Sequence, residues 1–157
     1  MVLSKDTIKN LIENQKIKVD PFRETSLGAI SLDLHLGKEA LNPDTGENIE
    51  IQDYHLSFDE FLLTNTIESV SIPGDLMARV VPRSSIARLG VLVTFDADIL
   101  PPNYKGRPIL TLKNLSKKPV LLSKGIAVCQ LIFEQVDRSV EGYKSRYEHK
   151  KIEPSKL

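Results

Sequence analysis

Short apolar segments, separated by glycine, proline and asparagine, recur along this chain and constrain its fold more than any other feature. In the clearest of them, Ile30–Leu36, apolar and polar side chains alternate strictly. A period of two places the isoleucine and the three leucines on one face of a strand, and the serine, Asp33 and His35 on the other. We expect Asp33 to anchor an arginine rather than to take part in catalysis.

Further strands are expected at residues 69–72, 77–81, 91–95, 108–112, 120–122 and 127–133. This spacing of strands favours an all-β barrel or sandwich.

One helix is expected near the start of the chain. Ile8, Leu11 and Ile12 recur there at helical spacing, after a possible capping residue at Ser4. The stretch 38–55 has a glycine-containing turn between short apolar patches, which indicates a surface hairpin rather than a linker.

The length of the chain favours a single domain that spans residues 1–157. Residues 138–157 are polar and charged, and we expect them to form a mobile tail. Such a tail can still become ordered on a ligand, although a solvated tail without a function suits the same composition.

Charge and hydropathy exclude several kinds of partner. Lys plus Arg and Asp plus Glu each total 21, so no overall basic field attracts nucleic acid or an anionic membrane. The apolar runs are shorter than the roughly 18 residues needed to span a bilayer, and the chain starts too charged for a signal peptide. We therefore expect a cytoplasmic protein.

The single cysteine, Cys129, lies in an apolar run and is expected to be a buried structural thiol.

The segment Val81–Gly90 carries two arginines and two serines within six residues, directly after an expected strand. A guanidinium group matches phosphate oxygens bidentately, and serine hydroxyls and the free N–H groups of a short helix start add further donors. The segment therefore predicts a polyphosphate site. Taken alone, the same pattern also suits a capped surface turn with solvated arginines.

Four motifs, in this order along the chain, carry a resemblance to one family. They are Ser31–Gly37, Arg83–Gly90, Asn103–Gly106 and Gly125–Phe133. Together they resemble the dCTP deaminase and dUTPase superfamily from about Leu3 to Leu157, and the deaminase branch fits best because residues 83–104 align with it without a gap. The resemblance implies a distorted β-barrel of the dUTPase-like, β-clip type with a short N-terminal helix. It also implies a homotrimer in which neighbouring subunits build each site.

The resemblance implies roles for single residues as well. The hairpin that ends at Gly106 would pair with the pyrimidine edge, and Tyr104 would pack on the deoxyribose. The residues expected at the base and sugar are Phe95, Tyr104 and Gln130. The residues expected at the phosphates are Arg83, Ser84, Ser85, Arg88, Arg146 and Lys150. Mg²⁺ would arrive with the nucleoside triphosphate, because the scattered histidines and the lone cysteine offer no metal-ligand spacing. A zinc-activated water is excluded on the same ground.

Two positions depart from the family's acidic residues. Pro101 stands where both branches carry an aspartate, and Thr111 stands where deaminases carry the glutamate that moves protons at C4 of cytosine. Loss of a general acid or base lowers the catalytic rate by a factor of about 10² to 10⁴. This argues against direct deamination. Two aspartates on the same hairpin could activate water instead. The catalytic candidates are Asp96, Asp98, Ser84 and Arg88.

These observations lead to three hypotheses about function. The leading one is a dUTP diphosphatase, which hydrolyses dUTP to dUMP and pyrophosphate with magnesium. One alternative is a dCTP deaminase that forms dUTP, favoured by motif spacing and opposed by Thr111. The other alternative is a catalytically silent deoxynucleotide-binding or regulatory protein, favoured by the loss of both acids together.

Overall fold

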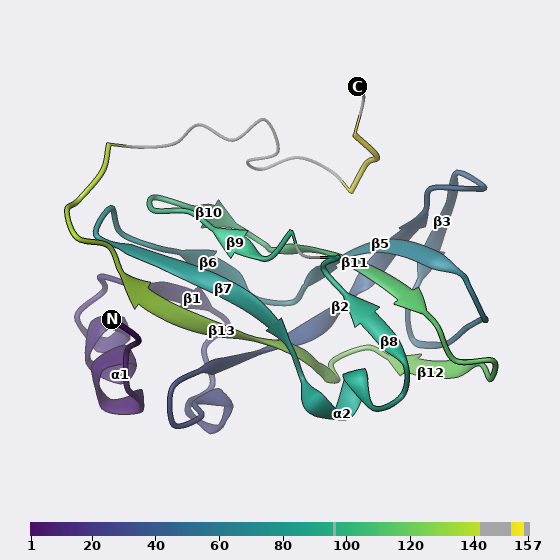
Figure 1. Cartoon of the computed structure of the whole chain (residues 1–157), viewed down its shortest axis with the longest axis horizontal. Coiled ribbons are helices and arrows are strands. Elements are labelled where there is room, and N and C mark those ends of the chain that lie inside the picture. Colours follow the sequence, from purple (N-terminus) through teal and green to yellow (C-terminus); the bar gives the residue numbers. More distant parts are fainter. Residues whose placement is uncertain (96, 142–151, 156–157) are drawn as a thin grey trace.

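Strands dominate the computed structural model, which describes residues 1–95, 97–141 and 152–155 (Figure 1). In chain order, the elements are α1 (Lys5–Glu13), β1 (Lys18–Asp20), the 3-10 turn η1 (Glu24–Ser26), β2 (Leu32–Asn42), β3 (Glu47–Glu50), β4 (Asp53–Leu56), β5 (Phe61–Thr66), β6 (Ser69–Ser71), β7 (Leu76–Pro82), α2 (Ser84–Ala87), β8 (Val91–Val93), β9 (Ile99–Leu100), β10 (Lys105–Gly106), β11 (Ile109–Asn114), β12 (Val120–Ser123) and β13 (Ala127–Gln135). The prediction of a mostly β fold with one short N-terminal helix is confirmed.

One large antiparallel sheet forms the body of the protein. Its strand order is β8-β11-β5-β2-β13-β7-β9, with β3 paired to the far end of β2. Two smaller sheets, β1-β6-β10 and β12-β4, lie beside it. The long strand β2 pairs with β13 through residues 32–35 and with β5 and β3 through its second half. The sheet curls into a half-barrel, which is the distorted barrel that the sequence predicts (Figure 1).

The apolar face of β2 is buried as the alternation predicts. Leu32, Leu34 and Leu36 are all buried in the core, while Asp33 and His35 lie on the opposite, partly exposed face. The prediction is wrong for Ile30, which is 50% exposed and precedes the strand. The N–H group of Gly28 donates to the carbonyl of Ser31 at 2.8 Å, so this stretch forms a turn instead of extending the strand.

The N-terminal helix begins where the sequence indicates. The Ser4 hydroxyl accepts a hydrogen bond from the N–H group of Thr7, and Ile8 and Ile12 face the core. Within the described residues, neither α1 nor any other helix has the length and apolar character needed to cross a membrane.

The sheets differ from the sequence prediction in several places. Strand β8 ends at Val93 rather than at Phe95, because Thr94 and Phe95 both adopt positive φ angles, 72° and 43°. The hairpin within 38–55 is present, but its first strand is the continuation of β2 rather than part of a separate surface insertion. Strands β1, β5, β9 and β10 were not predicted, although β5 lies between β2 and β11 in the large sheet.

Gly37 allows β2 to pass close to β5 at the point where their register shifts. A Cβ atom at this position would lie 2.3 Å from the Oδ1 atom of Asn65 and 2.8 Å from its backbone oxygen. No side chain fits at such distances. Glycine at the end of the motif Ser31–Gly37 is therefore required by the close approach of two paired strands.

Candidate functional site

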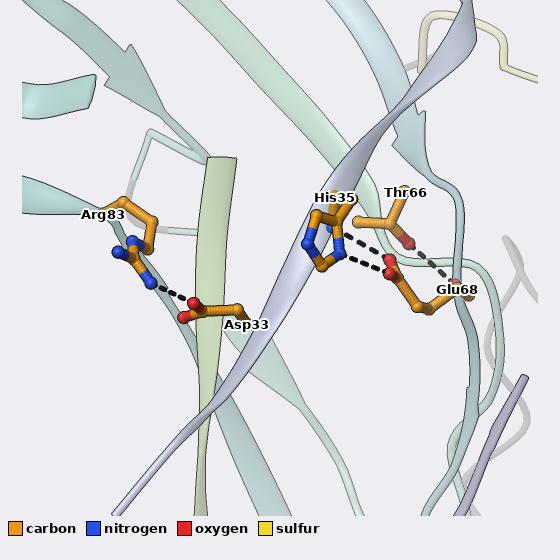
Figure 2. Close-up of polar contacts among 5 residues, drawn as sticks. All are labelled: Asp33, His35, Thr66, Glu68 and Arg83. Atoms are coloured by element: carbon orange, nitrogen blue, oxygen red, sulfur yellow. Dashed lines mark hydrogen bonds and ion pairs between the residues drawn. The ribbon is translucent and has the colours of Figure 1, made fainter. Parts of the chain in front are cut away.

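The motif arginine Arg83 lies where three strands of the large sheet run side by side. Gln130 on β13 pairs with Asp33 on β2 and with Val81 on β7, and Arg83 follows directly after β7. The Nη1 atom of Arg83 donates to the Asp33 carboxylate (Figure 2). Asp33 therefore anchors an arginine, as predicted, and it holds the guanidinium group in place.

A pocket of about 290 Å³ opens beside this ion pair, and we call it the Arg83 pocket. Its polar lining consists mainly of hydrogen-bond donors, since hydroxyl, amide and guanidinium groups outnumber the one carboxylate. The lining residues are Thr25, Ser26, Leu27, Gly28, Ser31, Asp33, Arg83, Ser84 and Gln130. Such a donor set suits the oxygens of a phosphate chain.

The predicted phosphate residues are only partly brought together. Arg83 and Ser84 line the Arg83 pocket, whereas Ser85 and Arg88 lie exposed on α2 outside its lining. Arg146 and Lys150 lie outside the described residues, as does most of the predicted tail. The serine residues of η1 and of the following turn were not predicted, because nothing in the sequence indicates that this turn lies beside β7.

A buried acid supports β2 next to the Arg83 pocket. The Glu68 carboxylate is 3% exposed and contacts His35 twice, at 2.6 Å from Nδ1 and at 2.9 Å from the backbone N–H group (Figure 2). The Thr66 hydroxyl donates to the backbone carbonyl of Glu68. These contacts fix the strand that carries Asp33.

Cys129 is buried in the core at the start of β13. Burial raises the pKa of its thiol well above the usual range, and the nearby negative charges of Glu68 and Asp33 raise the pKa further. A thiol in this environment stays protonated and is a poor nucleophile. The prediction of a structural, buried cysteine is confirmed.

A second and larger cavity, of about 880 Å³, lies against β3, β5, β11 and the loop that follows β8. We call it the hairpin pocket. Its lining includes Glu39, Leu63, Asn65, Tyr104, Ile109, Thr111 and Glu153. Cavities of this size accommodate a drug-sized or nucleotide-sized ligand.

The backbone around Tyr104 is held on both sides. Its N–H group donates to the carbonyl of Pro101 at 3.1 Å, and its carbonyl accepts from Ile72 at 2.9 Å. Asn103 adopts a positive φ of 64°, which asparagine tolerates better than most residues, and its side-chain amide donates to Val140. The hairpin is thus tied both to β6 and to the segment that follows β13.

Several predicted residues lie apart from the hairpin pocket. The ring of Phe95 packs against Phe61, with ring centroids 5.4 Å apart, and lines neither pocket. Asp98 lines neither pocket, and Asp96 lies outside the described residues. Gln130 lines the Arg83 pocket, so it does not lie with Tyr104 within one chain. The roles predicted for these residues stay predictions.

Sequence reasoning missed several residues that line the hairpin pocket. Among them are Glu39 on β2, Asn65 on β5, and Lys105 and Arg107 beside the predicted sugar-binding Tyr104. The strand β5 carries a signal that could have revealed Asn65, because threonine and apolar residues dominate Phe61–Thr66. In the described part of the chain, no three histidine, cysteine, aspartate or glutamate side chains gather as metal ligands.

Comparison with known structures agrees with this architecture. A crystal structure of 2′-deoxycytidine 5′-triphosphate deaminase from Agrobacterium tumefaciens superimposes with a TM-score of 0.72 over 86% of this chain, at 22% sequence identity. The chain spans about half of that protein's length, 48%. The fold is therefore of the dUTPase-like class that the motifs predict.

Sequence comparison narrows this class to one family. The family model described as dCTP deaminase-like matches residues 40–136. A protein of Aquifex aeolicus named dCTP deaminase, dUMP-forming, is 33% identical over 100% of this chain and 95% of its own length. A protein of the same name from Methanobrevibacter smithii is 35% identical over 89% of this chain and 83% of its own length. The chain belongs to the dCTP deaminase-like family.

Proposed function

We propose that the protein binds a deoxypyrimidine nucleoside triphosphate and converts dCTP to dUMP. The observation that carries this proposal is the Arg83 pocket, in which Asp33 holds the guanidinium group beside Ser84 and Gln130. These donors suit a phosphate chain. The names of the relatives, dCTP deaminase, dUMP-forming, support cytosine as the base and favour this reaction over the dUTP diphosphatase of our leading sequence hypothesis.

The proposed conversion breaks two bonds. One water replaces the amino group at C4 of cytosine and releases ammonia, and a second water breaks the bond between the α and β phosphates and releases diphosphate. Arg83 and Ser84 would neutralise and position the phosphates, and Tyr104 would contact the sugar. Asp98 stays a candidate for orienting the second water. Magnesium would enter as part of the nucleotide substrate, because triphosphate oxygens supply most of its ligands.

We further propose that the two pockets act together in a homotrimer. Among the described residues of one chain, the Arg83 pocket and the hairpin pocket share no lining residue. The family resemblance implies sites built from neighbouring subunits, which would bring the phosphate donors of one subunit to the base-binding hairpin of another.

Thr111 favours a second candidate, a catalytically silent protein that binds deoxynucleotides. Thr111 is among the residues that line the hairpin pocket, and it stands where the family resemblance expects a glutamate. A neutral hydroxyl does not exchange protons near pH 7 as a carboxylate does. The carboxylates that do line this pocket, Glu39 and Glu153, are exposed.

One assay separates the candidates. Purified protein is incubated with dCTP or dUTP and magnesium, and ammonia and pyrophosphate are measured separately. The proposal expects both products from dCTP. Pyrophosphate from dUTP, without ammonia from dCTP, would instead support the dUTP diphosphatase, and binding without either product would support the silent protein. Absence of binding of either nucleotide at millimolar concentration would overturn the proposal.

Two sets of variants test which residues orient water and transfer protons during the reaction. If Asp98 orients water, Asp98→Asn should lower turnover about 100-fold or more with nearly unchanged nucleotide affinity. If the chain is a disarmed relative, Pro101→Asp combined with Thr111→Glu should create or raise activity. An active protein whose rate responds to neither change would place water activation on a different residue.

A further inference from the structure

The hairpin that carries Tyr104 is fastened to the segment that follows β13. The side-chain amide of Asn103 donates to the carbonyl of Val140 at 2.9 Å, and the N–H group of Val140 donates to the carbonyl of Gly74, also at 2.9 Å. The backbone N–H group of Asn103 donates to the carbonyl of Pro73 at 3.4 Å. Three segments that are distant in sequence therefore meet at Gly74, Asn103 and Val140, and we call this contact the Val140 junction.

Gly74 gives the junction its close fit. A Cβ atom at this position would lie 2.8 Å from the Oγ atom of Ser139 and 2.9 Å from the carbonyl oxygen of Val140. It would also lie 3.2 Å from the side-chain nitrogen of Asn103. The φ angle of Gly74 is outside the positive range that favours glycine. Close packing, rather than backbone conformation, therefore excludes a side chain here.

The sheets hold the hairpin at its two ends. Strand β9 contributes two residues, which pair with β7, and β10 contributes two residues, which pair with β6. Between them the chain turns through residues 101–104, where Asn103 has a positive φ angle and the N–H group of Tyr104 donates to Pro101. Segments with few ladder hydrogen bonds open more readily than the centre of a sheet. The Val140 junction holds the turn that these short ladders leave out.

We infer that Asn103 and Gly74 are positioning residues, which fix Tyr104 for the nucleotide through the Val140 junction. The inference rests on the proposed function, in which Tyr104 contacts the deoxyribose. Asn103 directly precedes Tyr104, so a displacement of the one moves the other. A hairpin that is already ordered in the free protein binds its ligand more tightly, because less entropy is lost on binding. The backbone of Val140 thus has a role that is separate from the phosphate contacts predicted for the tail.

The first measurement follows the hairpin without a ligand. In the full chain, Asn103→Gly removes the amide donor but suits the positive φ angle, Asn103→Asp keeps the shape without the donor, and Gly74→Ala opens the junction from its other side. Each should raise the hydrogen-exchange rates of the Ile72 and Tyr104 amides about 3- to 10-fold, the usual effect of losing one hydrogen bond. The amide of Ile51, a fully buried residue ahead of β4, should exchange at the wild-type rate.

The second measurement connects the hairpin with the ligand. The full-length variants are titrated calorimetrically with dUMP and with α,β-imido-dCTP, an analogue whose bridge between the α and β phosphates resists hydrolysis. Each variant should bind both nucleotides about 3- to 10-fold more weakly. Affinity for inorganic diphosphate should keep its wild-type value, because diphosphate needs the Arg83 pocket alone. The double variant of Asn103→Gly and Gly74→Ala should lose no more affinity than the weaker-binding single variant, because both substitutions open the same contact.

A matched control separates this junction from any exposed amide. Asn14→Gly removes a side-chain amide that donates to the backbone carbonyl of Asn10 and that lies outside the lining of both pockets. It should change neither the exchange rates of the hairpin amides nor the affinity for either nucleotide. The two variants of Asn103 carry the test if Gly74→Ala does not fold.

Several outcomes would overturn the inference. The hairpin amides could keep their wild-type exchange rates, or exchange faster with unchanged nucleotide affinity. The effects of Asn103→Gly and Gly74→Ala could be additive, which would mean that they act at different contacts. Equal acceleration at Ile51 would show that the junction supports the whole fold instead of positioning Tyr104. If neither nucleotide binds the wild-type protein, the proposed function itself fails, and the exchange rates alone decide whether the junction orders the hairpin.

Discussion

Arg83 and Arg88 belong to the same motif but differ in their surroundings. Asp33 pairs with Arg83 and fixes its orientation, so replacing Arg83 also leaves a partly buried carboxylate without its partner. Arg88 ends the short helix α2 and is exposed, and no ion pair is found for it among the described residues. Arg88 lies outside the lining of the Arg83 pocket, so its role in phosphate binding stays a prediction from the motif, and that role can be tested separately from stability.

At the scale of single residues, we predict that Arg88→Ala weakens nucleoside triphosphate binding without disturbing the fold. Loss of a charge-assisted contact to phosphate corresponds to about 1.5 to 3 kcal/mol of binding free energy. Calorimetric titration with α,β-imido-dCTP measures the affinity, and thermal unfolding measures stability. Lys117→Ala, on the loop after β11, serves as a control for removing an exposed cation. Unfolding of Arg88→Ala with unchanged affinity in the folded fraction would show that Arg88 is structural.

At the scale of elements, the bend of β2 links the two pockets. The first half of this strand carries Asp33 to the Arg83 pocket, and its second half carries Glu39 to the hairpin pocket. Gly37 lies between them, where the backbone of β2 comes close to Asn65 on the neighbouring strand β5. Any side chain at this glycine would move β5, which also forms a wall of the hairpin pocket.

We therefore predict that Gly37→Ala destabilises the protein by about 1 to 3 kcal/mol, the usual cost of overpacking. Chemical denaturation measures this change in the free energy of unfolding. The control is Gly46→Ala in the turn between β2 and β3, where an added Cβ has no neighbour within 4 Å and only the positive φ of 74° opposes it. If the two variants lose equal stability, the close approach of Asn65 is not what requires Gly37.

The segment that follows β13 also bears on ligand binding. It is attached to the body through Val140, whose N–H group donates to Gly74 and whose carbonyl accepts from Asn103, each at 2.9 Å. Further along, residues 152–155 contribute to the lining of the hairpin pocket. The described residues near the end of the chain can thus affect a ligand in the hairpin pocket.

Deleting residues from Glu141 onward should leave a folded protein with a melting temperature close to that of the full chain. Affinity for α,β-imido-dCTP should fall about tenfold or more, because Arg146 and Lys150 are removed and each charge-assisted contact contributes about 1.5 kcal/mol or more. Affinity for dUMP should fall less than affinity for α,β-imido-dCTP, because the lost charged contacts concern the distal phosphates and residues 152–155 supply only part of the lining of the hairpin pocket. Equal losses for both ligands would argue against a tail that binds the triphosphate.

At the scale of the whole molecule, the two pockets are complementary but separate. One is rich in hydrogen-bond donors, and the other is a larger cavity whose walls are mainly apolar. A homotrimer of 17.6 kDa chains would have a mass of about 53 kDa, which light scattering after gel filtration measures directly.

A mixing experiment tests whether each site uses two subunits. Arg83→Gln impairs the Arg83 pocket while leaving Asp33 a hydrogen-bond donor, and Tyr104→Ala impairs the hairpin pocket. After the two variants are refolded together in equal amounts, about a quarter of the sites should regain wild-type affinity, because each site then draws its two halves independently. The separately refolded variants provide the baseline. No recovery on mixing would mean that each chain builds its site alone.

The amino-acid sequence by itself determined the β class, the capped N-terminal helix and most strands, because these depend on local periodicity and capping. It also determined that Asp33 would anchor an arginine and that Cys129 would be buried. Only the tertiary structure decided which side chains meet. Register and curl place Gln130 beside Asp33 instead of near Tyr104, and the left-handed residues after Val93 direct Phe95 onto Phe61. The contacts of Asn103 with Val140 and Gly74 likewise join segments distant in sequence, and local patterns contain no information about such neighbours.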